Sequence, residues 1–213
     1  MLDSVDPALA ETLYRESPGK RLELRLKSLQ WAGKLGFPTI TGFMVGIGES
    51  EESRRESLQE IARIHAEYGT IHEVLIQNFV PEPNTPFETN KPPTHQEMLA
   101  AVELARELLP EDIPVTVPVE LNQGIGDFIR AGVRDFPRVT YGQKGLIKGQ
   151  GFCSIDQLQE IVQAQGFTLQ RRFPLRQAFI QQGRYSKKLG QVFDHYRYKI
   201  KKDMQEKMKE KKV

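Results

Sequence analysis

The residues best placed to do chemistry in this sequence form a glycine-rich turn after a β-branched, apolar run. They follow the spacing Gly42-x-Met44-x-Gly46-x-x-Glu49, and an acidic segment typical of a helix start comes next. Glycine leaves the backbone without a Cβ, so a flat or anionic ligand can approach it closely. The helix that follows would direct free N–H groups toward the same place. The pattern indicates a ligand site at the end of a strand, with an ordinary tight turn as the alternative.

A second set of polar residues, all with side-chain amides, follows two later apolar runs. Gln77 and Asn78 end the first of these runs, and Asn122 opens the segment after the second. Two amides in succession cost free energy inside an apolar element unless something binds them. We therefore expect these three side chains to line a binding site, with the local backbone of a strand-end turn as the alternative partner of Asn78.

The elements that position these residues alternate between helix and strand. Helical periodicity covers 21–35 and 51–68, each closed by a glycine, and capping boxes at Thr94 and Ser154 open two more helices. This alternation predicts an α/β fold with right-handed crossovers, arranged as a partial (β/α) barrel. Three nearly continuous apolar runs predict parallel strands covered on both faces: Thr39–Val45, Val74–Phe79 and Val115–Val119.

Four separate segments, in this order, carry a resemblance to a known family: 18–20, 25–33, 39–50 and 73–86. The most specific part is the strand end Gln77–Phe79 with the proline-threonine loop that follows it. The sequence resembles the later half of a radical S-adenosylmethionine (radical SAM) enzyme, and within that superfamily it is most similar to the deazaflavin (FO) synthases. The resemblance extends to about Asp135 and continues more weakly in 154–175. It implies the C-terminal half of a TIM-like barrel, to which the apolar spacing of the tail adds a C-terminal helical extension.

The resemblance implies a binding site for S-adenosylmethionine. Arg25 stands where related enzymes present an arginine to the methionyl carboxylate, a group that a guanidinium fork meets bidentately. Asp3 and Ser4 match an acidic-plus-hydroxyl pair that contacts the ribose or amino group, although the close family usually carries glutamate at the first position. Without the resemblance, Arg25 is an ordinary solvated helical arginine. Asp3 and Ser4 would then cap a helix that Asp6 could cap equally well.

The same resemblance extends the cofactor site to the glycine turn and places the substrate beside it. The adenine would lie along Met44 to Gly46, with Gly42 in the same strand. Glu49 would join this site or, as the alternative, cap the helix that follows it. The three amides described above would contact a small-molecule substrate, because polar groups at the carboxyl end of barrel strands face the active site.

The iron–sulfur cluster of the family has no recognisable ligands in this sequence. Radical enzymes of this kind hold a [4Fe-4S] cluster on a Cys-x3-Cys-x2-Cys loop near the start of the barrel. This chain has one cysteine, Cys153, in a stretch that departs from the family. One thiolate cannot replace three protein ligands, so we assign no metal-binding and no catalytic residue. Because a complete barrel takes about 250 residues, we expect the first strand–helix units to be missing and the chain to be inactive alone.

Three classes of function remain open. In the first, the chain is part of a radical SAM lyase of deazaflavin (coenzyme F420 precursor) biosynthesis and works with an N-terminal cluster-binding half. In that family a 5′-deoxyadenosyl radical abstracts hydrogen from a tyrosine-derived 5-amino-6-ribitylaminouracil adduct, and ring closure gives 7,8-didemethyl-8-hydroxy-5-deazariboflavin. In the second, the chain is a non-catalytic half-barrel binding module or a decayed paralogue. In the third, it is an unrelated barrel enzyme whose glycine strand holds a phosphate.

Composition and charge narrow the set of partners. With 30 Lys and Arg against 28 Asp and Glu, the body of the chain carries no strong field for nucleic acid. No apolar run is long enough to span a bilayer, and no signal-peptide pattern opens the chain. We therefore expect a cytoplasmic protein with neither nucleic-acid nor membrane partners.

The expected organisation is a barrel part at 1–185, with a divergent glycine-rich loop at 136–152, and a basic amphipathic helix at 186–213. The lysine-rich face of that helix would suit nucleic acid or an acidic membrane surface. The alternative, which we favour, is a helix docked on the domain by its apolar stripe with its lysines in solvent. A partial barrel exposes a strand edge and an apolar inner face. This predicts self-association or dependence on a partner chain.

Overall fold

The computed structural model of the chain describes residues 1–136 and 154–197. Two compact units divide the chain, Met1–Gln170 (unit 1) and Arg171–Val213 (unit 2). The divergent loop with Cys153, and the lysine-rich part of the tail after 197, lie outside the described residues. All the strands and all the predicted site residues belong to unit 1.

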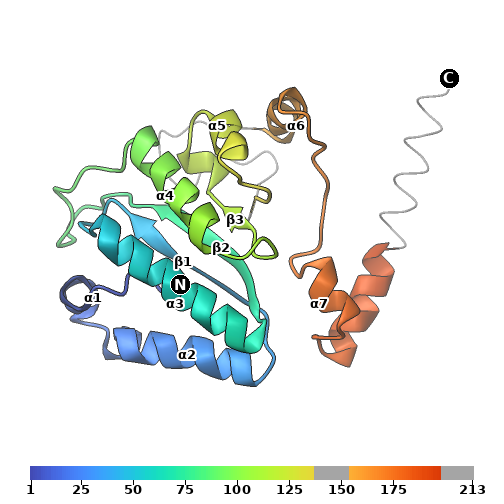
Figure 1. The fold of residues 1–213 in the computed structure, drawn as a ribbon, viewed down its shortest axis with the longest axis horizontal. Coiled ribbons are helices and arrows are strands. Elements are labelled where there is room, and N and C mark those ends of the chain that lie inside the picture. Colours follow the sequence, from blue (N-terminus) through green and yellow to red (C-terminus); the bar gives the residue numbers. More distant parts are fainter. Residues whose placement is uncertain (137–153, 198–213) are drawn as a thin grey trace. The chain divides into compact units, whose positions relative to one another are not determined.

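Unit 1 is built on a parallel sheet of three strands in the order β1-β2-β3 (Figure 1). The strands are β1 (Thr39–Val45), β2 (Ile71–Asn78) and β3 (Val115–Thr116). Single parallel bridges add Asp3 beside β1 and Asp135 beside β3, so the sheet order follows the sequence order throughout. The α/β fold is therefore confirmed. Its sheet is open rather than a closed barrel, and the partial barrel stays a prediction.

The helices agree closely with the periodicity of the sequence. The predicted 51–68 helix is confirmed at both ends, with Ser50 as its N-cap and a left-handed Gly69 closing it. Capping boxes at Thr94 and Ser154 are also present. The α-helices are α1 (Pro7–Tyr14), α2 (Leu22–Lys34), α3 (Glu51–Tyr68), α4 (His95–Leu108), α5 (Ile125–Arg130), α6 (Ile155–Ala164) and α7 (Gln177–Gln181), and short 3-10 turns lie at Pro18–Lys20 and Val119–Leu121.

One face of the sheet carries the main hydrophobic core. Figure 1 shows α2, α3 and α4 side by side over the strands, and α3 contacts both of its neighbours. Phe43 of β1 and Ile76 of β2 pack in the same buried cluster as Leu58 and Ile61 of α3. Burial of these side chains fixes the strand order and so determines which strand ends are adjacent.

The third predicted strand is shorter than the sequence indicates. The apolar run Val115–Val119 was expected to be strand throughout, but β3 ends at Thr116. Pro118 has no N–H to donate to a ladder, and it is the N-cap of the 3-10 turn that begins at Val119. The side chains of the run are buried all the same, which explains its apolar character.

Unit 2 contains α7 and a helical stretch at 187–197. Phe193, on the apolar stripe of the predicted amphipathic helix, is buried, and its ring centroid lies 5.0 Å from that of Phe173 and 5.2 Å from that of Tyr185. Leu189 and Tyr196 on the same helix are exposed. None of the helices in the described part of the chain is long and apolar enough to cross a membrane.

Candidate functional site

Arg25 and Asp3, predicted as parts of one cofactor site, lie together at the edge of the sheet. Arg25 Nη1 donates to Asp3 Oδ2 at 2.7 Å, and the two side chains are only 16% and 13% exposed. The Asp3 backbone carbonyl accepts from the N–H of Met44 at 3.0 Å, which ties the pair to β1. The structure therefore places an arginine and an aspartate next to the predicted adenine strand. Arg25 is not a freely solvated helical arginine.

Tyr14, which no sequence pattern singles out, completes this cluster. Its ring lies under the guanidinium of Arg25, with 4.2 Å between the guanidinium carbon and the ring centroid, and its hydroxyl donates to the Asp3 carboxylate. Burial, followed by the contact with Asp3, raises the pKa of the Tyr14 phenol, so the phenol stays protonated as a donor. Tyr14 and Arg25 are 11 residues apart on different helices, so no local pattern could have paired them.

Two of the three nitrogens of the Arg25 guanidinium already donate hydrogen bonds within the chain. Its Nε donates to the carbonyl of Lys20 at 3.0 Å, and Nη1 serves Asp3 and the carbonyl of Met1. A ligand carboxylate could therefore reach Nη2 directly. A bidentate contact would require the carbonyl of Lys20 or the carboxylate of Asp3 to give way.

Asp6, rather than Asp3 or Ser4, takes the helix-capping role that was the alternative for this segment. Asp6 is the N-cap of α1 and accepts from the N–H groups of Ala8 and Leu9 at 2.9 and 3.1 Å. The hydroxyl oxygen of Ser4 accepts from the N–H of Asp6 at 3.1 Å, and Ser4 is 4% exposed. Ser4 therefore shapes the chain between Asp3 and the start of α1.

The glycine turn after β1 is held by Glu49. Its carboxylate accepts from the N–H of Gly46 at 3.0 Å and from that of Ile47 at 2.9 Å, and Arg54 donates to it through Nε at 2.8 Å and Nη2 at 2.6 Å. The Glu49 side chain is 2% exposed. The interpretation of Glu49 as a helix cap is wrong, because Ser50 holds that position. The turn was expected to bind a flat or anionic ligand. Its N–H groups instead donate to the carboxylate of Glu49, which belongs to this chain.

Both glycines of the motif, Gly42 and Gly46, are required because neighbouring protein atoms lie against them. A Cβ on Gly42 would lie 1.9 Å from the carbonyl oxygen of Leu75 in β2, and one on Gly46 would lie 2.8 Å from Cδ of Pro93. Gly46 also has φ +97, a conformation that favours glycine. Close approach of the backbone is thus real, as the sequence indicated, but the approaching groups belong to this chain.

The predicted amides divide into a pair and a single residue. Asn78 and Asn122 face each other: Asn78 Nδ2 donates to Asn122 Oδ1 at 3.0 Å, and Asn122 Nδ2 donates to Asn78 Oδ1 at 2.8 Å and to the carbonyl of Pro118. Gln77 is half-buried, and its Nε2 donates to the carbonyl of Asn78 at 3.3 Å. The Asn78 side chain was expected to need a hydrogen-bonding partner, and Asn122 supplies it.

The register of the sheet connects the two groups. Met44 of β1 pairs with Gln77 of β2, and Val45 pairs with Asn78, so the Arg25–Asp3–Tyr14 cluster and the amide pair lie at the same, carboxyl, end of the strands. This is the end at which ligands bind to parallel α/β sheets. Within 1–136 and 154–197, no group of three or more His, Cys, Asp or Glu side chains is arranged to hold a metal ion.

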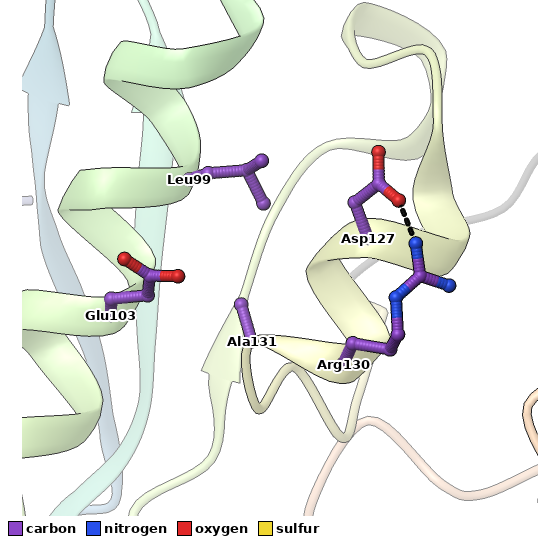
Figure 2. A pocket seen from close by; sticks show the side chains of 5 residues that line it. All are labelled: Leu99, Glu103, Asp127, Arg130 and Ala131. Carbon is purple, nitrogen blue, oxygen red and sulfur yellow. Dashed lines mark hydrogen bonds and ion pairs between the residues drawn. The ribbon is translucent and has the colours of Figure 1, made fainter.

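A separate cavity of about 340 Å³ lies between α4 and α5, away from these residues (Figure 2). The Asp127 carboxylate in its wall pairs with Arg130, and it also lies 2.8 Å from Nε2 of His95. Two of the polar groups of the wall, Asp127 and Arg130, thus pair with each other. The lining residues come from helices rather than strand ends: Leu99, Glu103, Asp127, Arg130 and Ala131.

The fold and the site define an α/β protein whose polar residues gather at the carboxyl ends of parallel strands in sequence order. No family model matches the chain. Curated proteins to which it is similar are 7,8-didemethyl-8-hydroxy-5-deazariboflavin synthases, so the chain is homologous to a deazaflavin synthase. It is 40% identical to that of Methanothermobacter thermautotrophicus over 183 residues, which are 84% of this chain and 56% of the relative.

Two further relatives give the same result. The chain is 36% identical to the synthase of Archaeoglobus fulgidus, covering 90% of this chain and 59% of the relative, and 37% identical to that of Methanopyrus kandleri, covering 85% and 54%. The chain thus spans little more than half the length of the curated relatives it matches.

Proposed function

We propose that this chain is the C-terminal part of a radical SAM barrel of the deazaflavin synthase type and forms the floor of its S-adenosylmethionine site. The observation that carries the proposal is the match of 84% of the chain to a 7,8-didemethyl-8-hydroxy-5-deazariboflavin synthase at 40% identity. The activity proposed for the complete assembly is the formation of that deazaflavin, a precursor in coenzyme F420 biosynthesis, from a tyrosine-derived adduct.

The topology supports the barrel assignment. Five parallel segments, from Asp3 through the three strands to Asp135, follow one another in the sheet in sequence order. Helices α3 and α4 connect successive strands and cover the same face (Figure 1). A (β/α) barrel has this arrangement, and further strand–helix units added at the Asp3 edge would continue it.

The residues beside β1 fit part of S-adenosylmethionine. Arg25 Nη2 would meet the methionyl carboxylate, and Asp3 would accept from an amino or hydroxyl group. The adenine would lie along Met44 of β1 and Gly46 in the turn after it. When bound, this cofactor supplies the radical chemistry of the family. Tyr14 holds the guanidinium flat, which reduces the entropy lost on binding.

The [4Fe-4S] cluster of the family does not fit this chain. The sequence has a single cysteine, and the described residues contain no set of side chains that could ligate a metal. We therefore assign this chain to binding and derive no radical step from its residues. An N-terminal cluster-binding half, as a separate chain or a further portion of this one, is the proposed partner.

The substrate side of the proposed site is formed by Gln77, with Asn78 and Asn122 behind it. Asn78 and Asn122 hold each other and so fix the end of β2, whereas the Gln77 side chain has an acceptor oxygen in no hydrogen bond with the described residues. An amide presented in this way suits the polar edge of a uracil-type ring.

A titration with S-adenosylmethionine tests the proposal. We expect weak binding to this chain alone and tighter binding after an N-terminal cluster-binding half is added under anaerobic conditions. In the joined assembly, Arg25→Lys should weaken binding by about 1–3 kcal/mol, because it keeps the charge but loses the planar fork. Arg63→Lys, on the exposed face of α3, is the matched control and should leave affinity unchanged.

Equal affinity with and without the added half, or an Arg25→Ala variant that binds normally in the assembly, would contradict the cofactor site. The non-catalytic half-barrel module would then replace it as the function. The phosphate-binding alternative is disfavoured by the structure, since Glu49 already occupies the N–H groups of Gly46 and Ile47.

A further inference from the structure

The two units of the chain carry opposite net charge. In unit 1, 24 Asp and Glu outnumber 16 Lys and Arg, whereas in unit 2, 14 Lys and Arg outnumber 4 Asp and Glu. The near-neutral balance of the whole chain therefore combines an acidic unit with a strongly basic one. In the described part of unit 2, at 171–197, there are seven basic residues and one acidic residue, and five of the basic ones are exposed: Arg171, Arg172, Lys187, Lys188 and Arg197.

The helical stretch at 187–197 carries an exposed row of apolar side chains. Leu189, Val192 and Tyr196 are 39%, 44% and 49% exposed. At about 100° of rotation per residue they fall within about 60° of one another, so they form one stripe, which we call the exposed stripe of unit 2. Phe193, beside this stripe, is buried in the aromatic cluster of unit 2. The small core of the unit thus takes one side of the helix and leaves the exposed stripe uncovered.

The charges of this helix are sorted around the exposed stripe. Lys188 is exposed and lies about 40° from Val192 in rotation, at the edge of the stripe. Asp194, the one acid of the helical stretch, lies on the other side of the helix, and its carboxylate is 3.8 Å from Nη1 of Arg197. An apolar stripe with a basic residue beside it and its acid turned away is typical of a helix that lies in the surface of an anionic bilayer.

We propose that unit 2 attaches the chain to an anionic lipid surface, with the exposed stripe in the headgroup region and the basic side chains against the lipid phosphates. Three apolar side chains bury too little area to hold a protein on a bilayer alone, so the attraction between opposite charges is needed as well. Binding should therefore be reversible and should weaken as salt is added. The proposal is independent of S-adenosylmethionine binding.

The aliphatic side chains of the stripe favour lipid over nucleic acid as the anionic partner. Nucleic acid also attracts basic residues, but its bases stack on aromatic rings, and Leu189 and Val192 offer no such surface. Acyl chains, in contrast, gain free energy from any apolar contact that excludes water. Tyr196 suits the headgroup layer, because its ring is apolar and its hydroxyl is polar.

Flotation of the full chain with lipid vesicles tests the proposal. We expect the chain to bind vesicles that contain about 30% phosphatidylglycerol in phosphatidylcholine, and to bind pure phosphatidylcholine at least about tenfold more weakly. Raising the salt from about 50 to about 500 mM should weaken binding to the anionic vesicles about tenfold or more. Equal binding to the two kinds of vesicle, or no binding to the anionic ones, would overturn the proposal.

Variants of the helix locate the binding surface. Leu189→Glu should lower the partition coefficient on anionic vesicles about tenfold or more, whereas Leu24→Glu, at a position of α2 with 40% exposure, is the matched control and should leave it unchanged. Lys188→Glu should also lower it about tenfold or more, because it replaces an attraction with a repulsion. Lys27→Glu, exposed on α2, is the control for that change of charge. Controls that lost as much binding as the unit 2 variants would refute the proposed surface.

Competition with nucleic acid distinguishes the two anionic partners. A single-stranded oligonucleotide, added at a phosphate concentration equal to that of the anionic lipid, should leave the chain on the vesicles. Displacement of the chain by the oligonucleotide, with Leu189→Glu binding the oligonucleotide as well as the unaltered chain does, would show that unit 2 binds nucleic acid through its charges alone. The lipid proposal would then be wrong.

Discussion

Removal of the Glu49 carboxylate should destabilise unit 1 more than removal of any exposed carboxylate of α3. Glu49 joins two elements, since it accepts from the N–H groups of Gly46 and Ile47 after β1 and from Arg54 of α3. Its side chain is 2% exposed and that of Arg54 is 14% exposed, so water cannot readily replace either partner. The substitution Glu49→Ala leaves two N–H donors and one guanidinium without their acceptor.

The magnitude follows from these contacts. Hydrogen bonds to a charged group contribute about 1.5–3 kcal/mol, and breaking a buried ion pair by removing one partner costs about 3–5 kcal/mol. Arg54 keeps some access to solvent, so the lower end applies, and we expect Glu49→Ala to lower the free energy of unfolding by about 3 kcal/mol. Glu49→Gln keeps the shape and one acceptor oxygen, and should cost about 2 kcal/mol.

Urea unfolding followed by circular dichroism measures these differences, provided that the dependence on urea concentration is the same in each variant. Glu60→Gln is the matched control, because Glu60 pairs with Arg63 at 2.7 Å on the exposed face of α3. An exposed pair contributes about 0–1 kcal/mol. If Glu49→Gln cost no more than Glu60→Gln, the turn would not depend on the carboxylate, and the role of Glu49 as the internal anion of the glycine turn would be refuted.

Reconstitution with iron and sulfide should give no stoichiometric [4Fe-4S] centre, and an absorbance of a bound cluster that persists in Cys153→Ser would contradict this. Asn78→Ala and Asn122→Ala should each lower the free energy of unfolding by about 1–3 kcal/mol, and the double variant should cost less than their sum. The backbone N–H of Thr94 lowers the pKa of Glu97, so the stability from this capping box is present above the unfolded-state pKa and is lost as pH falls through the folded-state value. Urea midpoints at neutral and acid pH should therefore differ less in Glu97→Gln than in the unaltered chain.

Local signals in the sequence were sufficient for most of the helices. The helix at Glu51–Tyr68 was predicted at both ends because acidic residues begin it and Gly69 ends it in the left-handed conformation. The helix at Leu22–Lys34 was predicted to within one residue at each end. The strand after Pro114 was predicted too long, because an apolar run shows burial but does not show that its N–H groups join a ladder.

The contacts of the candidate site could not be predicted in the same way. Asn78 and Asn122 are 44 residues apart, and Arg25 and Asp3 are 22 apart, so each pair meets only after the strands are in register. Their residue types could be selected as polar groups at strand ends. Their partners could not be predicted, because a single sequence shows which side chains need hydrogen bonds but does not show which groups supply them.

The glycine motif shows how one local pattern serves two different needs. Gly42 has no room for a side chain because the carbonyl of Leu75 lies against it. Gly46 has no room for one because the ring of Pro93 lies against it. The N–H groups of Gly46 and Ile47, which a phosphate would use, donate to the carboxylate of Glu49 in the same turn. A turn that contains its own anion has no net attraction for a second one, because the positive ends of its dipoles are already neutralised. The structure therefore disfavours an anion bound by the turn itself.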